Sequence, residues 1–320
     1  MFKNSSEVVY KVIFLGTPAF AVPCLERLLE GPYSIEAVFT QPDRPSGRGR
    51  KLTPAPVKEY AGARGLRVFQ PETLRTEEIA RQFTALNADV AVVAAYGKMI
   101  PSDILSLPRC GCVNLHPSLL PSYRGASPVA SSILSGDSRT GVTVMLLDEG
   151  MDSGPVLARR EEDILDNDTG GTLTARLAER GADLLAEVLP LWLEGRVEPQ
   201  PQDESKAVYT EMLTKQDGLV DWRRTATELA RQVRALSPWP GSFTYWQNKQ
   251  LKILEAVPVE GGRSRPGYVT GLPSTAPAPV GVETSEGILA LTRIQLEGKK
   301  EVTIQEFILG QRSFTDSTLA

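Results

Sequence analysis

Apolar positions in the first half of the chain follow two different spacings. Continuous apolar runs at 11–16 (KVIFLG) and 35–40 (IEAVFT) are typical of buried parallel strands, whereas the apolar residues at 21–30 recur with the spacing of one helical face. The same alternation continues through a helix into a strand at 90–95 and ends with the strand CVNLH at 112–116. We therefore predict an α/β fold with a doubly wound, mostly parallel, Rossmann-like sheet, in which ligands gather at the carboxyl ends of the strands.

The second half of the chain changes character after an amphipathic helix at 170–195. The polar, Pro-containing stretch that follows is predicted to be a linker. After a helix at 226–236, short β-type runs separated by Gly, Pro and Asn predict a smaller β-barrel or sandwich. We therefore expect a first domain at 1–195, a linker at 196–212 and a second domain at 213–320.

Composition narrows the class of protein. With 41% hydrophobic and 23% charged residues, the 320-residue chain can bury a substantial core, and its net charge of −4 disfavours wholesale nucleic-acid binding. The three cysteines lack CxxC spacing, which favours reduced thiols over a disulfide framework or a metal site. No apolar run approaches the length of a membrane span. We expect a cytoplasmic protein without a metal ion and without membrane attachment.

The strand at 112–116 carries the single histidine of the chain, His116. Imidazole is the side chain that normally exchanges protons near neutral pH. Asn114 stands two residues earlier, so both side chains point to the same face of the strand. A carboxamide and an imidazole together suit acyl transfer, in which one stabilises a developing oxyanion and the other moves protons. The residues alone equally allow a histidine that only hydrogen-bonds the backbone.

A Gly-rich loop after the apolar strand GVTVMLL supplies carboxylates that could join this pair. It contains Asp148, Glu149 and Asp152, and loop acids of this kind are commonly solvated. Asp152 stands between the apolar Met151 and the Ser-Gly pair at 153–154, which favours an inward orientation. A carboxylate beside an imidazole would fix the tautomer of the ring and prepare it for proton transfer.

The stretch TQPDRPSGRGRKLTPAPVK at 40–58 has five basic residues and one acid, with Gly and Pro throughout. We predict a loop, neither helix nor sheet strand, that projects from the end of the second strand. A solvated surface loop is the simplest interpretation, but a net charge of +4 beside the predicted site suits the docking of phosphates. The motifs GxGxxG, GxxxxGK[ST] and GxSxG are absent, which disfavours NAD-dependent, ATP-dependent and serine-hydrolase chemistry.

Taken together, the stretches NLHPSLLPSYRGASP, GVTVMLLDEGMDSGPVL and GTPAFAVP and the basic stretch at 40–58 resemble the formyltransferases that use 10-formyltetrahydrofolate. The resemblance runs from Val12 to roughly Arg312. It implies transfer of a formyl group to the α-amine of methionine carried by initiator tRNA. It also implies that Asn114, His116 and Asp152 are the catalytic residues.

The same resemblance implies the binding residues. For the folate cosubstrate these are Ser118, Leu119, Leu120 and Pro121, to which we add Tyr96 and Gly97 at the end of the strand at 90–95. For the tRNA they are Arg44, Arg48, Arg50 and Lys51 in the basic stretch. The resemblance further implies an OB-like C-terminal barrel that holds the tRNA body, and we expect a monomer.

The C-terminal part from Ala207 onward has 13 Lys and Arg residues against 12 Asp and Glu residues. A surface that faces tRNA there must therefore arise from segregation of charge rather than from bulk basicity. The basic residues that could form it are Arg223, Arg224, Arg231, Arg234 and Lys249.

Two alternatives stay open on these residues. A formyltransferase acting on a sugar-nucleotide or glycinamide amine, or a hydrolase of the same cosubstrate, would share Asn114, His116 and Asp152. A non-catalytic RNA-binding protein would use the sheet as a scaffold and the basic stretch as a phosphate-binding arm. A screen of charged tRNA against small amines as formyl acceptors distinguishes the related enzymes from a tRNA formyltransferase. The variant His116→Ala tests the RNA-binding alternative, because it should have no effect on a protein without catalytic activity.

Overall fold

A computed structural model describes residues 9–46, 51–262 and 265–320 of the chain. These residues form two compact units, each built from more than one segment. The first runs to Gly125 and includes Thr140–Asp163 and Thr174–Tyr209, and the second comprises Ala126–Arg139, Ile164–Leu173 and Thr210–Ala320. In the described ranges we find no helix with the length and apolar character needed to cross a membrane.

The elements follow the chain in this order. The helices are α1 (Val22–Glu30), α2 (Pro56–Gly62), α3 (Glu77–Leu86), α4 (Ser102–Leu105), α5 (Pro128–Ser135), α6 (Gly170–Leu193), α7 (Ala226–Ala235) and α8 (Ile304–Gly310), with 3-10 turns η1 (Ala19–Ala21), η2 (Glu204–Lys206) and η3 (Gln216–Gly218). The strands are β1 (Tyr10–Gly16), β2 (Tyr33–Phe39), β3 (Arg44–Ser46), β4 (Lys51–Thr53), β5 (Val68–Phe69), β6 (Val90–Ala94), β7 (Cys112–His116), β8 (Arg124–Gly125), β9 (Arg139–Leu146), β10 (Val156–Asp163), β11 (Tyr209–Thr210), β12 (Ser242–Trp246), β13 (Lys249–Val259), β14 (Val269–Gly271), β15 (Val280–Glu283), β16 (Ile288–Leu296) and β17 (Val302–Thr303).

The first unit is built on a seven-stranded sheet with the strand order β10-β9-β7-β6-β1-β2-β5. Neighbours from β7 to β5 are parallel, whereas β9 runs antiparallel to β7. The apolar runs of the sequence occupy the central strands, and every residue of β6 and β7 is buried. The predicted doubly wound, mostly parallel sheet is therefore confirmed.

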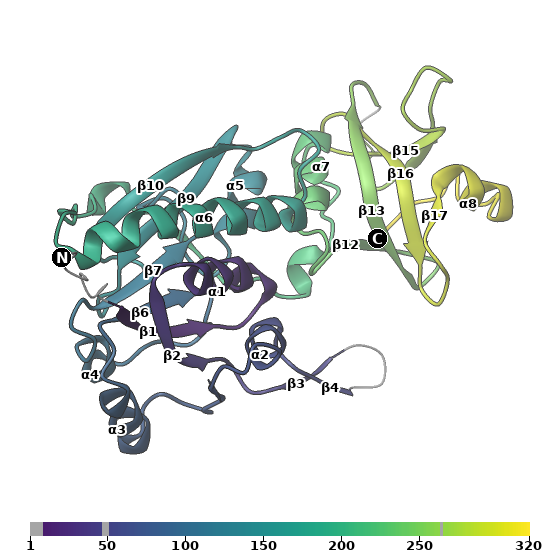
Figure 1. Cartoon of the computed structure of the whole chain (residues 1–320). Coiled ribbons are helices and arrows are strands. Elements are labelled where there is room, and N and C mark those ends of the chain that lie inside the picture. The colour runs from purple at the N-terminus through teal and green to yellow at the C-terminus, as the bar shows by residue number, and fades with distance from the viewer. Residues whose placement is uncertain (1–8, 47–50, 263–264) are drawn as a thin grey trace, which may run out of the picture. The chain divides into compact units, whose positions relative to one another are not determined.

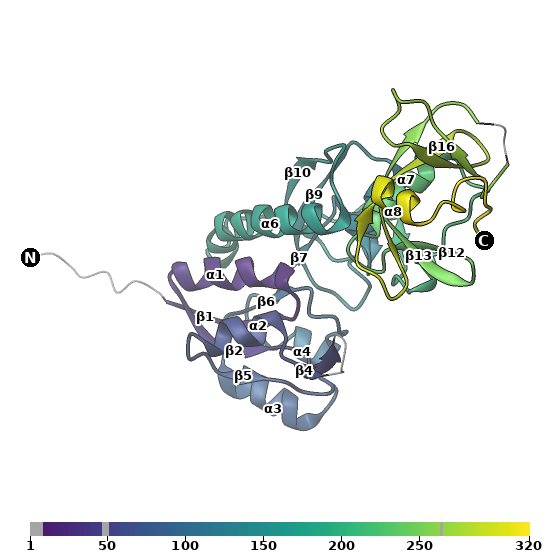
Figure 2. The ribbon, with the colours of Figure 1, turned by 90° about the vertical axis from the view of Figure 1, so that its right-hand side faces the viewer.

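Helices cover both faces of this sheet (Figure 2). On one face α3 and α4 pack on the strands, in a core that contains Phe39, Phe83 and Ile104. On the other face lie α1 and α6, and Gly181 lets α6 approach β7 closely, because a Cβ there would come within 2.6 Å of Leu115. The sheet is thus a rigid layer held between two layers of helices.

The parallel strands bring several polar residues to one edge of the sheet. His116 ends β7, Tyr96 follows β6, and Thr40 follows β2. Antiparallel β9 reverses the direction, because Leu146 at its carboxyl end pairs with Val113 near the amino end of β7. The acidic loop after β9 therefore begins at the opposite edge and has to fold back along β7 to reach His116.

The second unit contains a six-stranded antiparallel sheet, in which β12, β13, β16, β15 and β14 follow one another and β17 pairs with β16 (Figure 1). The segment 316–320 bonds to both outer strands. Tyr245 in β12 exchanges two backbone hydrogen bonds of 3.1 Å with Ala320, and Val269 in β14 donates to the oxygen of Ser317 at 2.9 Å. The segment closes the sheet, which confirms the small barrel predicted for this part of the chain.

The barrel has its own apolar core, to which α7 contributes Leu229 and Val233. Trp246 and Phe314 meet edge to face in this core, with ring centroids 5.4 Å apart. The start of α7 is fixed by a capping box, in which the Thr225 hydroxyl accepts from the backbone of Glu228 and the Glu228 carboxylate accepts in return.

The basic stretch is more regular than the sequence predicts. Arg44–Ser46 and Lys51–Thr53 form the antiparallel pair β3 and β4, and α2 begins at Pro56. The expectation that this stretch contains neither strand nor helix is therefore wrong for its described part. Proline at the first helical turn lacks only an N–H that has no partner within the helix, so it starts α2 rather than breaking it.

Candidate active site

His116 is held in one orientation at the end of β7, where its side chain is 6% exposed. Its ring Nε2 lies 2.9 Å from the backbone oxygen of Tyr123, which can only accept a hydrogen bond. Nε2 therefore carries a hydrogen, and Nδ1 is the ring atom left for proton exchange. The tautomer of the ring is therefore fixed by the Tyr123 carbonyl and not, as the sequence predicts, by Asp152.

Asp152 reaches the other nitrogen of the same ring. Its Oδ2 lies 3.6 Å from Nδ1 of His116 and accepts a hydrogen bond from the backbone N–H of Gly125 at 2.8 Å. The backbone of Asp152 is left-handed, with φ 51°, a conformation that Asp tolerates better than most residues. Asp148 stays within the loop, where it accepts from Gly150 and Ser153. The structure thus brings Asp152, and not Asp148, to the imidazole.

Asn114 lies on the same side of β7, two residues before His116, and is 8% exposed. In the part of the chain that the structure describes, its carboxamide makes no hydrogen bond with protein. A buried amide without partners is unfavourable unless a ligand or water satisfies it. Its N–H₂ group and oxygen are therefore available to a bound molecule beside His116.

The segment at 118–121 is fastened to β9. The Thr143 hydroxyl donates to the backbone oxygen of Ser118 at 2.7 Å and accepts from the N–H of Leu120 at 3.2 Å. The Ser118 hydroxyl donates to the oxygen of Ser122, and the Leu120 side chain is buried. Leu119 and Pro121 are the partly exposed members of the segment. A ligand here would therefore meet the backbone and these two side chains.

Tyr96 and Gly97 follow β6 at the same edge of the sheet. The Tyr96 ring is buried in the core beside α3, and burial raises its pKa to about 12. The Tyr96 backbone oxygen accepts hydrogen bonds from the side chains of Thr17 at 3.0 Å and Gln41 at 2.9 Å. Gly97 is exposed, and its φ of 78° lies in the left-handed region that favours glycine. Gly97 is the one of the two that is open to a ligand.

The hairpin of β3 and β4 is anchored at its base by Asp43. This carboxylate accepts from Nζ of Lys58 at 2.6 Å and from the amide of Gln70 at 2.8 Å, and these two contacts hold the pKa of Asp43 below its usual range. Lys58, which lies in α2, is therefore paired with the acid that precedes β3.

The basic residues expected to meet phosphates lie further along this hairpin. Arg44 is exposed, and its guanidinium donates to Oε1 of Gln41 at 2.7 Å. Arg48 and Arg50 lie outside the described residues, as does the side chain of Lys51. Arg44 is thus the member of this group whose surroundings the structure describes.

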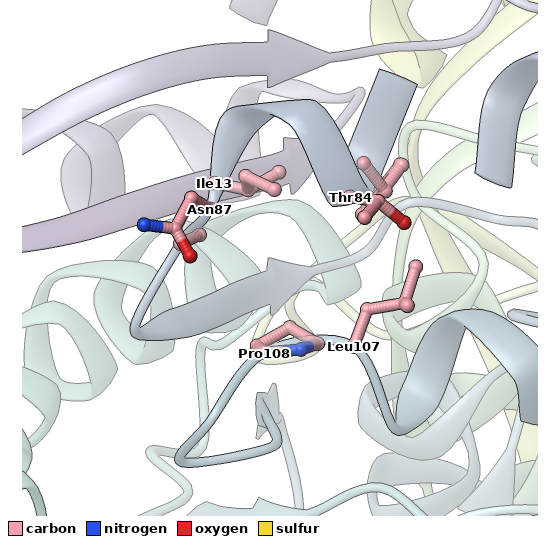
Figure 3. A pocket seen from close by; sticks show the side chains of 7 residues that line it. Ile13, Thr84, Asn87, Leu107 and Pro108 are labelled. Carbon is pink, nitrogen blue, oxygen red and sulfur yellow. The ribbon is translucent and has the colours of Figure 1, made fainter. Parts of the chain in front are cut away.

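Two cavities of the described chain lie away from the residues of this site. One, of about 110 Å³, lies where the chain leads into β6 and β7, with Leu107 and Pro108 across from Thr84 and Asn87 (Figure 3). The other, of about 520 Å³, belongs to the barrel unit and is lined by Arg265 and Glu283 among others. Asn114, His116 and Asp152 line neither cavity.

Two contributors to the site were not predicted from the sequence, the carbonyl of Tyr123 and the N–H of Gly125. Both act through backbone atoms, which every residue carries, so residue type gives no sign of them.

A carboxamide, an imidazole and a carboxylate converge beside the carboxyl edge of a parallel α/β sheet. Residue types in this arrangement are suited to an enzyme that transfers a group. Residues 10–189 match the model of the formyl transferase family, and residues 212–312 match the model of the formyl transferase C-terminal domain. The chain belongs to the formyl transferase family.

Relatives of known name cover nearly the whole chain. The chain is 46% identical over 301 residues to a methionyl-tRNA formyltransferase of Chloroflexus aurantiacus, which covers 94% of this chain and 96% of the relative. It is 46% identical over 303 residues to a methionyl-tRNA formyltransferase of Roseiflexus sp., at 94% and 93% coverage.

A solved N-formyltransferase from Helicobacter canadensis, in complex with folinic acid and dTDP-3-aminofucose, shares the fold. Its TM-score is 0.62 at 17% identity, over 92% of this chain and 100% of that one.

Proposed function

We propose that this chain transfers the formyl group of 10-formyltetrahydrofolate to the α-amine of methionine on initiator tRNA, in the cytoplasm, at the start of translation. The observation that carries the proposal is the cluster of Asn114, His116 and Asp152, in which Nδ1 of His116 lies 3.6 Å from Asp152. Relatives at 46% identity over nearly the whole chain, which are methionyl-tRNA formyltransferases, support the choice of acceptor.

The residues at the carboxyl edge fit a folate cosubstrate. 10-Formyltetrahydrofolate supplies an activated formyl group, and the buried amide of Asn114 fits its carbonyl oxygen because it has no protein partner in the described chain. We assign the contacts to the pteridine to exposed Gly97 and to the segment at 118–121 (Ser118, Leu119, Leu120 and Pro121). Tyr96 supports this wall from the core side.

Asn114 acts on charge that develops during the transfer. When the amine attacks, negative charge grows on the formyl oxygen, and the Asn114 N–H₂ group donates to it. Such a donor is worth about 3–4 kcal/mol of barrier lowering. Because β7 is buried and fixed, the donor needs no rearrangement at that moment.

His116 and Asp152 carry the proton. The α-amine of an aminoacyl ester loses a proton as its bond to the formyl carbon forms, and Nδ1 of His116 accepts it. Asp152 then stabilises the imidazolium across 3.6 Å, while the Nε2 bond to Tyr123 keeps the ring in place. The ring returns the proton to the nitrogen that leaves as its bond to the formyl carbon breaks.

We assign recognition of the tRNA to the hairpin and the C-terminal barrel, with Arg44, Arg48, Arg50 and Lys51 contacting phosphates. In the barrel unit, Arg223 bonds to Asp221, and Arg224 and Arg234 also have protein partners. Arg231 and Lys249 are then the more available cations. A monomer with domains at 1–195 and 213–320 and a linker at 196–212 remains part of the proposal.

The test is a formylation assay with the purified chain, 10-formyltetrahydrofolate and charged initiator tRNA. We expect formylmethionyl-tRNA, and no product from free methionine, uncharged tRNA or a dTDP-amino sugar. Formylation of the amino sugar in place of the tRNA would contradict the acceptor. Binding of tRNA without any product would favour the RNA-binding alternative.

A further inference from the structure

Beside the proposed site lies a buried arginine that the mechanism does not use. Arg124 has a fully buried side chain, and its guanidinium meets the Glu204 carboxylate through two hydrogen bonds of 2.7 and 2.9 Å. It also donates to the hydroxyl of Tyr209 at 3.0 Å. A buried cation with this many partners is fixed in place, because any movement would leave charge unpaired.

Arg124 fixes the direction of a neighbouring amide, Gln202. Two guanidinium nitrogens donate to Oε1 of Gln202, at 2.9 and 3.1 Å. The amide oxygen is thereby engaged, and the N–H₂ end must point the other way. There it donates to the backbone oxygens of Asp152 and Gly154, each at 2.8 Å. One side chain therefore bridges the buried cation and the loop that carries the Asp152 carboxylate.

The acidic loop needs such a bridge for two reasons. Asp152 has a left-handed backbone, and Gly154 passes so close to the carbonyl of Leu146 that no Cβ fits. The loop also leaves β9 level with the amino end of β7, where Leu147 donates to the oxygen of Cys112. Its return to the other end of β7 is held at Asp152 by contacts from outside the loop.

Three consecutive residues join these contacts. Tyr123 accepts from Nε2 of His116, Arg124 orients Gln202, and the N–H of Gly125 donates to the Asp152 carboxylate. The imidazole and the carboxylate are therefore positioned from one short segment. The two groups lie 3.6 Å apart, and the segment and Gln202 bond to the residues that carry them.

We propose that Gln202, oriented by Arg124, is a positioning residue that holds the Asp152 carboxylate against Nδ1 of His116. The inference rests on the proposed function only in taking this pair as the proton carrier. It assigns a role in catalysis to a residue that acts through the backbone of the loop carrying Asp152.

The experiment compares Gln202→Glu and Gln202→Met with Gln200→Glu. Gln202→Glu keeps a partner for Arg124 but turns an oxygen toward the carbonyls of Asp152 and Gly154, while Gln202→Met removes the donor without adding charge. Gln200 lies two residues earlier, and in the described chain its side chain forms a hydrogen bond only to the backbone oxygen of Glu198, so its variant is the matched control.

We expect both Gln202 variants to lower kcat by about 10- to 100-fold, with the KM values for tRNA and folate within about twofold of wild type. Gln200→Glu should leave kcat unchanged. A wild-type kcat in Gln202→Glu, or a loss confined to KM, would overturn the positioning role. The unfolding midpoint of each variant shows whether a loss of kcat comes from misfolding. If Gln202→Glu is misfolded, the kcat of Gln202→Met tests the positioning role instead.

A second readout does not depend on the identity of the acceptor. The chain has one histidine, so proton NMR gives one set of imidazole signals, which belongs to His116 in a tag-free preparation. Both Gln202 variants should shift these signals at fixed pH, and Gln200→Glu should not. Unshifted signals would overturn the inference even in an active enzyme. Shifted signals in a chain that does not formylate tRNA would support it while the proposed function fails.

Discussion

The two ends of the parallel strands in the first unit differ in what their polar groups contact. At the amino ends, Asp89 accepts from the backbone of Lys11 at 2.9 Å and pairs with Arg109 at 3.0 Å. At the carboxyl ends, the Asn114 amide has no protein partner in the described chain and Nδ1 of His116 faces Asp152 at an ion-pair distance. The polar side chains compared at the amino ends bond to one another and to the backbone, whereas the Asn114 amide at the carboxyl ends is left for a bound molecule or water.

Substitution at the carboxyl end should have the largest effect on activity. His116→Ala and Asp152→Asn should each lower kcat by about 10³-fold or more, because the proton then has no carrier. The unfolding midpoint should stay close to that of wild type. Steady-state formylation assays and thermal melts measure the two quantities.

The control for this prediction is Asp148→Asn, since Asp148 contacts only Gly150 and Ser153 of its own loop among the contacts found for its side chain. Near-normal turnover in His116→Ala would refute the mechanism.

Substitution at the amino end should reverse the pattern. Asp89→Ala removes the acceptor for Lys11 and the partner of Arg109, and should lower the free energy of unfolding by about 1–2 kcal/mol. The kcat should be unchanged, because the site lies at the other end of the strands. Chemical denaturation with a parallel assay measures both. A kcat loss in a variant that is still folded would show that the two ends are not independent.

Loss of one exposed cation from the hairpin should have a smaller effect. Arg44→Ala should reduce kcat/KM for tRNA by about 3- to 10-fold, and the loss should shrink as salt rises. Turnover at saturating tRNA should be maintained. The control is Arg81→Ala, which removes another exposed arginine, from α3. Equal losses in the two variants would indicate only a general effect of charge.

The smallest expected effect is on the pH dependence of stability. Hydrogen bonds from Arg124 hold the pKa of Glu204 below its usual range. The folded state therefore favours the carboxylate, and its contribution to stability is complete above the ordinary pKa and is lost as pH falls through the lowered one. The difference in melting temperature between wild type and Glu204→Gln should narrow from pH 7 to pH 4. A difference that is constant over this range would contradict the assignment.

The central sheet could be predicted well from the sequence, but the site could be predicted only in part. Buried strands such as β6 have continuous apolar runs, and the alternation along β7 places Asn114 and His116 on one face. The route of the loop that carries Asp152 could not be predicted from the sequence. The apolar run at β9 indicates a strand, but it does not show that this strand runs antiparallel to β7, which decides where the loop begins. Gln202 lies in a polar stretch whose composition indicates a linker, and its partner Arg124 is 78 residues away in sequence.

Closure of the barrel by the segment 316–320 has a consequence for synthesis on the ribosome. Until Ser317 and Ala320 emerge from the exit tunnel, β12 and β14 present open backbone edges that can pair with a neighbouring nascent chain. The sheet that carries His116 has all its strands by Asp163, long before that moment. A chain truncated before Ser317 would therefore still contain every strand of the sheet that carries His116, while β12 and β14 kept exposed backbone edges.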